Sequence, residues 1–150
     1  MRKKVLVVLS LLCLFGACRY DEGGGSIPIK NRIRGEWKVN KIQKNGVATT
    51  SESPSIGETL NNLFDFYISQ RLQINYLDEG TVYQADGFYE FSSDKKKIIA
   101  KFSDRYRSYE RNYEILKFKN KELKVKFTDD ENTEWILQFT LIQSFIDYGL

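Results

Sequence analysis

Histidine is missing from this 150-residue chain, and cysteine is scarce. Because histidine is the commonest general base near neutral pH and the commonest metal ligand, its absence excludes Ser-His catalysis and histidine-bound metals. The two cysteines, Cys13 and Cys18, both lie near the N-terminus, so the rest of the chain has no thiol chemistry and no disulfide framework. Carboxylates alone could still hold a metal or exchange protons. We expect a protein that is not an enzyme and holds no cofactor.

Long apolar runs are also scarce, and the one at residues 5–15 stands out. It follows the basic residues 2–4, is interrupted by Ser10, and ends before the small residues Gly16 and Ala17. This order is typical of a signal peptide. The run is about half the roughly 20 apolar residues that a membrane-spanning helix needs. We expect residues 1–17 to be removed on export.

The segment Phe15-Gly16-Ala17-Cys18 resembles the lipobox of bacterial lipoproteins. The resemblance implies that the Cys18 thiol receives a diacylglycerol, that the preceding peptide bond is cut, and that the new amine is acylated, for example with palmitate. Two or more acyl chains anchor a protein stably where one does not. The expected location is the cell envelope, as an outer-membrane lipoprotein. The alternative is an ordinary signal cut elsewhere, with Cys18 as an incidental thiol.

Residues 18–32 are expected to form the lipid anchor and a flexible tether, because residues 19–26 are polar and rich in glycine. Asp21 and Glu22 resemble the acidic export signal of Bacteroidetes-type lipoproteins. That resemblance implies display on the cell surface. The alternative is a solvated linker.

The net charge depends on the signal peptide. The whole chain has 23 basic and 20 acidic residues, but three of the basic ones precede the apolar run. Their removal would leave 20 basic residues against 20 acidic ones. A neutral domain has no global positive field to attract nucleic acid.

From residue 33 onward, apolar and polar residues alternate between short turns, as in antiparallel strands with one buried face. The clearest strand is 122–128, in which Lys124 and Lys126 separate apolar residues. We predict one all-β domain at residues 33–150, an antiparallel sheet with one buried face and one short helix. The candidate strands are 36–43, 46–50, 71–77, 81–84, 88–92, 97–102, 113–118, 122–128 and 134–142.

Turns and the helix are predicted from local residues. Asn45-Gly46 and Asp86-Gly87 predict tight hairpin turns, because both pairs favour positive φ angles. The apolar residues 60, 63, 64, 67 and 68 follow helical spacing, and Glu58 would lie in the first turn. We predict an amphipathic helix over this segment.

A Gly-x-Trp element, Gly35-Glu36-Trp37, begins the first predicted strand. With the later segments DGFYEFSSDKKKI, YEILKFKNKELKVKF and WILQFTLI, it is similar to short bacterial lipocalin-like domains over residues 33–142. The resemblance implies an antiparallel up-and-down lipocalin-like barrel of about eight strands. Gly35 and Trp37 would mark this fold, and Trp37 would pack across the closed end. In lipocalins an arginine of the last strand joins this tryptophan. The last predicted strand has none, and Arg32 or Arg34 could take its place.

Inward positions of the predicted strands would line the barrel. Aromatic side chains there suit an apolar or flat ligand. In the competing interpretation, the same side chains fill the interior, as is common in small barrels. The candidate lining residues are Leu72, Ile74, Tyr76, Tyr83, Tyr89, Phe91 and Phe102.

Between residues 105 and 113, cations are interleaved with aromatic side chains, which stack on flat rings and hold anions. This segment is either a rim that contacts a ligand or partner, or a solvated strand and loop. Nucleic-acid binding is disfavoured by the expected location. The candidate rim residues are Arg105, Tyr106, Arg107, Tyr109, Arg111 and Tyr113.

Acidic residues gather at 129–131 and at Asp78-Glu79. Neither group lies in a ligand loop of recognised calcium-binding spacing, and both coincide with expected turns. We expect no metal site.

These patterns favour a non-catalytic module that binds a small hydrophobic or amphipathic molecule, by analogy of fold alone. The alternative is a protein-interaction subunit of an envelope or cell-surface complex. The expected partners are the membrane, through the lipid on Cys18, and a small apolar ligand or an envelope protein, but no nucleic acid.

Overall fold

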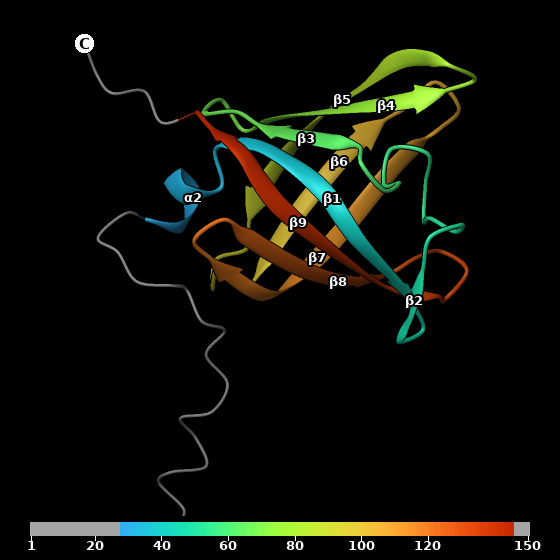
Figure 1. Ribbon diagram of the computed structural model, residues 1–150. Helices are drawn as coiled ribbons and strands as arrows, with labels where there is room; N and C mark the ends of the chain where they lie inside the picture. Colours follow the sequence, from blue (N-terminus) through green and yellow to red (C-terminus); the bar gives the residue numbers. More distant parts are fainter. Residues whose placement is uncertain (1–27, 146–150) are drawn as a thin grey trace, which may run out of the picture.

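The computed structural model describes residues 28–145, which form a closed antiparallel barrel of eight strands with one further short strand (Figure 1). The predicted all-β, up-and-down architecture is confirmed. The predicted signal peptide, Cys18 and the glycine-rich stretch lie outside the described residues. Within residues 28–145, no helix is long and apolar enough to span a membrane.

The barrel closes because β1 pairs with β3 on one edge and with β9 along the other. From β3 to β9, each strand pairs with the next one in the chain, and β2 pairs only with the end of β1. The elements in chain order are α2 (Ile29–Arg32), β1 (Gly35–Lys44), β2 (Val47–Thr49), β3 (Leu63–Phe66), β4 (Arg71–Asp78), β5 (Thr81–Phe91), β6 (Lys97–Ser103), β7 (Ser108–Lys119), β8 (Glu122–Thr128) and β9 (Glu134–Ser144).

Alternation places the apolar face of each strand in one core. On β8, for example, Leu123, Val125 and Phe127 are buried, whereas Lys124 and Lys126 are half-buried on the outer face. Burial of such side chains is the main favourable term in folding.

The Asn45-Gly46 turn is confirmed, with φ angles of 48° and 82°. The Asp86-Gly87 turn is wrong, because both residues lie inside the continuous strand β5. A Cβ on Gly87 would lie 2.0 Å from the Lys101 carbonyl oxygen and 2.6 Å from the Phe102 Cα. Glycine is needed there for the close approach of β6. The predicted strands 81–84 and 88–92 are therefore one strand.

The predicted helix at residues 60–68 is also wrong, because this segment contains an irregular loop and then β3. Asn61 has a φ angle of 71°, which ends any helical turn there. β3 fills the gap between β1 and β4, and its pairing with both strands outweighs local spacing. The one described helix is α2, a single turn in the segment that we assigned to the tether.

The two ends of the barrel are named here for the segments that cover them: the turn end for the single helical turn α2, and the loop end for the loop of residues 50–62 (Figure 1). The turn end carries α2, whose Ile29 and the following Ile33 are buried against the core. Trp37 is fully buried there, and its Nε1 donates a hydrogen bond to the Ile33 carbonyl at 2.7 Å. The loop end, on the right in Figure 1, carries the loop of residues 50–62 between β2 and β3.

Candidate functional site

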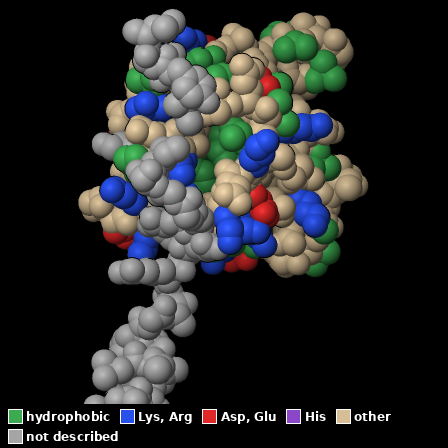
Figure 2. Space-filling view, turned by 60° about the vertical axis from the view of Figure 1, so that its left-hand side comes forward, with side chains coloured by type: hydrophobic (Ala, Val, Ile, Leu, Met, Phe, Trp, Pro, Cys, Tyr) green, Lys and Arg blue, Asp and Glu red, His purple; other side chains and the backbone are tan. Residues whose placement is uncertain are grey.

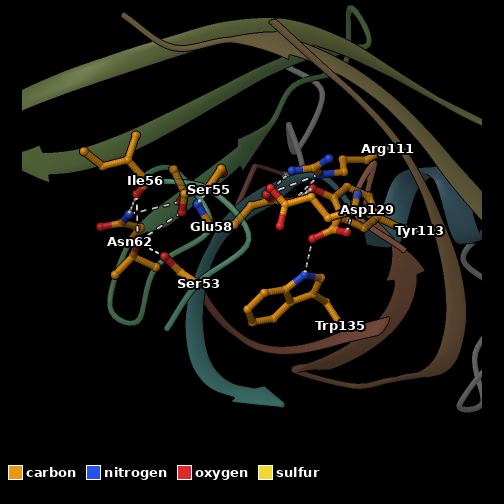
Figure 3. Close-up of polar contacts among 12 residues, drawn as sticks. Ser53, Ser55, Ile56, Glu58, Asn62, Arg111, Tyr113, Asp129 and Trp135 are labelled. Atoms are coloured by element: carbon orange, nitrogen blue, oxygen red, sulfur yellow. Dashed lines mark hydrogen bonds and ion pairs between the residues drawn. The ribbon is translucent and has the colours of Figure 1, made fainter. Parts of the chain in front are cut away.

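The loop end is closed by residues 50–62, which fold back over the barrel between β2 and β3. The loop holds its own shape: Asn62 Nδ2 donates to the carbonyls of Ile56 at 2.8 Å and Gly57 at 3.0 Å. Its base is fixed to β1, because the Asn61 amide donates to the Val39 carbonyl at 2.8 Å. These bonds direct Glu58 into the barrel (Figure 3).

Glu58 is fully buried, and its charge is matched by Arg111 of β7, which is 3% exposed. Arg111 Nε donates to Glu58 Oε1 at 3.0 Å, and Nη2 donates to Oε2 at 2.9 Å. Two parallel contacts of this kind are the strongest geometry for a guanidinium and a carboxylate. Burial lowers the pKa of Arg111, but the hydrogen bonds and charge of Glu58 outweigh burial and raise it above its ordinary value. Arg111 therefore stays ionised inside the barrel.

Tyr113 completes the cluster, because its hydroxyl donates to Glu58 Oε1 at 2.6 Å. Burial and the negative charge of Glu58 raise the pKa of Tyr113 well above its usual range. The phenol therefore remains a donor at any physiological pH. Glu58 thus accepts bonds from two residues that lie two positions apart on the inward face of β7.

The Arg111 guanidinium is also held by aromatic rings. Its central carbon lies 4.8 Å from the ring centre of Tyr109 and 4.9 Å from that of Phe127. Phe127 in turn packs edge-on against Tyr113, with 5.1 Å between the ring centres. Cation–π contacts are strongest where water is excluded. Rings of β7 and β8 therefore hold this cation in addition to Glu58 of the loop.

A pocket of about 460 Å³ opens beside this cluster and reaches Arg111. On its wall, Trp135 Nε1 donates to Asp129 Oδ2 at 2.7 Å (Figure 3). Burial favours neutral Asp129, but the bonds from Trp135 and from the amides of Thr133 and Glu131 outweigh it and lower its pKa. The lining residues are Lys44, Ser51, Glu52, Ser53, Pro54, Arg107, Arg111, Asp129, Asp130, Glu131, Thr133 and Trp135.

No protein-family model and no curated protein sequence matches this chain. The lipocalin-like resemblance therefore remains a prediction, whereas the barrel rests on the strand pairing described above.

The candidate rim residues divide between two environments. Arg105 and Tyr106 lie in the β6–β7 loop, where Arg105 pairs with Asp78 at 3.2 Å and stacks over Tyr83 at 4.4 Å. The other members follow the alternation of β7, so Tyr109 is half-buried and Arg111 and Tyr113 are buried. Arg107 reaches the mouth of the pocket and stacks over Tyr109 at 4.6 Å. The segment therefore contributes both rim and interior.

The candidate lining residues pack into the core. Leu72, Ile74, Tyr76, Tyr89 and Phe102 are buried in one hydrophobic cluster, while Tyr83 and Phe91 pack against its edge. Two of the seven reach a larger pocket of about 610 Å³ at the turn end. Tyr89, Phe91, Ile29, Ile68, Arg34 and Lys95 are among its lining residues.

Figure 2 turns the left-hand side of Figure 1, where α2 lies, toward the viewer. Hydrophobic side chains on this face lie among Lys and Arg side chains. The turn end thus offers a second surface of mixed character.

The fold markers and acidic groups also have definite places. Trp37 packs edge-on against Phe118 at 5.8 Å, and Arg32 stacks over that ring at 4.9 Å. This is the neighbourhood in which we expected Arg32 or Arg34. Gly35 begins β1 and pairs with both β3 and β9. Among residues 28–145, no group of three or more metal-ligating side chains is arranged to hold an ion.

Sequence reasoning missed Glu58, which it placed in a helix. Ser55 and Glu58 have the spacing of a helix-capping pair, and the Glu58 amide does donate to Ser55 Oγ at 3.2 Å. The available signal was Arg111, because the alternation of β7 puts it at an inward position. An inward arginine requires a buried acidic partner.

Proposed function

We propose that this protein is a lipid-anchored envelope protein whose barrel binds a small amphipathic molecule at the loop end, without chemical conversion of that molecule. The observation that carries the proposal is the place of Arg111. Its buried guanidinium lies between an open pocket and an aromatic interior. Ligand sites typically combine apolar walls with a few fixed polar groups.

The surroundings of Arg111 suit a molecule with a polar head and an apolar body. Trp135, Tyr109 and Phe127 provide aromatic surface near the cation. Arg107 adds a second positive charge at the mouth of the pocket, while Lys44 there is paired with Glu52. An anionic or zwitterionic head group would therefore meet Arg107, and it would reach Arg111 by taking the place of Glu58.

Catalysis is not part of the proposal, because the buried carboxylate is fully engaged. Glu58 accepts bonds from Arg111 and Tyr113. Both of its oxygens are therefore occupied by donors of the protein. Binding is the simpler use of this cluster.

The anchor would orient the barrel. Cys18 and Pro28 lie ten positions apart, and a chain of this length spans at most roughly 35 Å. Because α2 lies at the turn end, lipid on Cys18 would hold that end close to the membrane. The pocket at the loop end would then face away from the bilayer.

Native mass spectrometry of the protein purified from its original host tests this proposal. We expect a bound small molecule that is lost under mild activation. A matched test uses Trp135 as a fluorescent reporter during titration with dodecanoate, dodecanol and lysophosphatidylcholine. If no small molecule accompanies the protein and none of the three probes binds, the proposed binding function is wrong.

A second function is favoured by one surface. Leu77 and Val82 lie directly opposite each other near the tip of the β4–β5 hairpin and are 60% and 69% exposed. Tyr106 is also exposed, and its hydroxyl bonds to the adjacent Asp78. Exposed apolar side chains that cluster often mark a protein contact. In vivo cross-linking that joins the wild type, but not a Leu77→Lys/Val82→Lys variant, to an envelope protein would support a role as an interaction subunit.

A further inference from the structure

The loop presents to the barrel the chemical features of an amphipathic carboxylate. Glu58 supplies the carboxylate, and Ile56 and Leu60, two positions away on either side, pack against the hydrophobic core. We propose that Glu58 occupies a carboxylate-binding site built by β7 and β8, and that the ligand is an amphipathic carboxylate that replaces Glu58 there. This inference rests on the proposed binding function and names its ligand class.

The site is assembled without the loop. Arg111, Tyr109 and Tyr113 belong to β7, and Phe127 belongs to β8. The two rings that hold the guanidinium are on these strands. The edge-on contact between Phe127 and Tyr113 fixes the phenol in the same way. Departure of Glu58 would leave a fork of donors and a hydroxyl in place, ready for another carboxylate.

Charge balance decides what can replace Glu58. A buried guanidinium that loses its partner is strongly unfavourable. Exchange of one carboxylate for another keeps the cation paired throughout, whereas a neutral or cationic head group would leave Arg111 uncompensated. The two-contact geometry of Arg111 also matches the planar, two-oxygen form of a carboxylate. The inference therefore commits to a carboxylate head group.

The apolar part of the ligand would take the place of apolar loop residues. Ile56 and Leu60 contact the core from the loop side. Gly57 lies against Ile74, since a Cβ there would be 3.4 Å from the Ile74 side chain. Movement of residues 53–60 away from the barrel would vacate this space next to the carboxylate site. A short alkyl or ring system would fit the vacated contacts.

The loop is attached in a way that allows this movement. Its two bases are fixed to β1, through the ion pair of Glu52 with Lys44 and through the backbone bonds of Asn61 and Asn62 with Val39. Between the bases, Glu58 makes the polar contacts that join residues 53–60 to the described strands. The remaining side-chain bonds, such as Thr59 to the Ile56 carbonyl, are internal to the loop. Release of one carboxylate therefore removes these polar contacts, and the apolar contacts of Ile56, Gly57 and Leu60 with the core are what the ligand must replace.

A tethered competitor weakens the apparent affinity for the ligand, because only the fraction of molecules with an open site can bind. Removal of the Glu58 charge should therefore strengthen binding. We expect Glu58→Gln to bind dodecanoate at least tenfold more tightly than the wild type does. Glu52→Gln removes a carboxylate from the same loop outside the site, and it should leave the affinity unchanged.

The experiment measures dodecanoate and dodecanol binding by calorimetry on the full folded domain, for the wild type, Glu58→Gln and Glu52→Gln. We expect dodecanoate to be preferred over dodecanol at least tenfold by both the wild type and Glu58→Gln. Equal affinity for the two probes, or no gain in Glu58→Gln, would overturn the carboxylate assignment but leave the binding function intact. Absence of binding in every variant would instead overturn the binding function itself.

A measurement on the wild type covers the case in which Glu58→Gln does not fold. Hydrogen exchange of residues 53–60 should accelerate when dodecanoate binds, because the loop has left the barrel. With dodecanoate labelled with ¹³C at the carboxyl carbon, the bound head group should remain ionised below its pKa in water. Unchanged exchange together with an unshifted titration of the bound head group would overturn the inference.

Discussion

Glu58 and Arg111 lie 53 positions apart in the chain and form a two-contact ion pair inside the barrel. The cluster also includes the Tyr113 hydroxyl, which bonds to Glu58, and the rings of Tyr109 and Phe127, which flank the guanidinium. The stability of the loop end and the proposed binding site therefore depend on the same two charges.

Removal of one partner of this pair should lower the free energy of unfolding much more than removal of both. We expect Arg111→Met to destabilise the fold by about 3–5 kcal/mol, because it leaves a buried carboxylate without compensation. The double variant Glu58→Gln/Arg111→Met should recover most of that loss. Urea unfolding of Glu58→Gln, Arg111→Met, the double variant and the wild type gives the coupling free energy.

The exposed pair of Lys101 and Glu110 provides the control for this cycle, with 3.5 Å between charged atoms and both side chains mostly in solvent. Lys101→Met should have a far smaller effect than Arg111→Met. Additive effects of the Glu58 and Arg111 substitutions would contradict a coupled buried pair.

Asp65 should make the protein less stable as the pH rises from 4 to 6. Burial, together with the charge of Glu36, raises the pKa of Asp65 to about 6, against a single hydrogen bond from Asn75. Between the unfolded value and pH 6, the folded state binds the extra proton, so stability falls with rising pH. A shift of about 2 pKa units corresponds to roughly 3 kcal/mol.

Asp65→Asn should remove this dependence and be more stable than the wild type above pH 6, because the amide is neutral and keeps an acceptor for Asn75. Urea unfolding from pH 4 to pH 8 measures the difference. Glu36→Gln should shift the transition to lower pH. A difference between wild type and Asp65→Asn that stays constant across this range would show that Asp65 is not the titrating group.

Gly87→Ala should destabilise β5 and β6, because the added methyl group would meet the Lys101 carbonyl at 2.0 Å. Backbone atoms cannot rotate away, so the strands must separate, at a cost of about 1–3 kcal/mol or more. Thermal unfolding measures the loss. Ser103→Ala, at an exposed position of the neighbouring β6, is the control and should be nearly neutral. A Gly87→Ala protein as stable as this control would contradict the close approach.

Cys18→Ser should abolish incorporation of a labelled fatty acid and release the protein from membranes, because the proposed anchor is attached through the thiol. Labelling and membrane fractionation in the original host measure both effects. Cys13→Ser is the matched control, since this residue lies in the apolar run that is expected to be removed. Unchanged membrane partition of Cys18→Ser would refute lipid anchoring at this residue.

The strands were largely predictable because their signal is local. Alternation in segments such as 122–128 places one face in the core whatever the partner strand is. Turn residues such as Asn45-Gly46 act through their own backbone preferences. An antiparallel sheet with neighbouring connections follows from these two kinds of signal, whereas closure into a barrel was implied by the lipocalin-like resemblance.

Local signals failed where a distant segment decided the conformation. Residues 60–68 have helical spacing, but without β3 one edge of β1 and one edge of β4 would be unpaired, and β3 pairs with both. Asp86-Gly87 has the preferences of a turn, but the close approach of β6 explains the glycine inside a strand. In both cases, pairing between strands outweighs the preference of a few residues.

The candidate site was also predictable in part from local signals, and in part it was decided by distant segments. The sequence pattern singled out Arg111 and Tyr113 as chemically notable, and the alternation of β7 is sufficient to turn both inward. The alternation carries no information on which acidic residue pairs with Arg111 and Tyr113. That pairing depends on closure of the barrel by β1 and β9 and on the path of residues 50–62 across the loop end. A buried charge selects its partner through space, and only the tertiary structure brings Glu58 within 3.0 Å of Arg111.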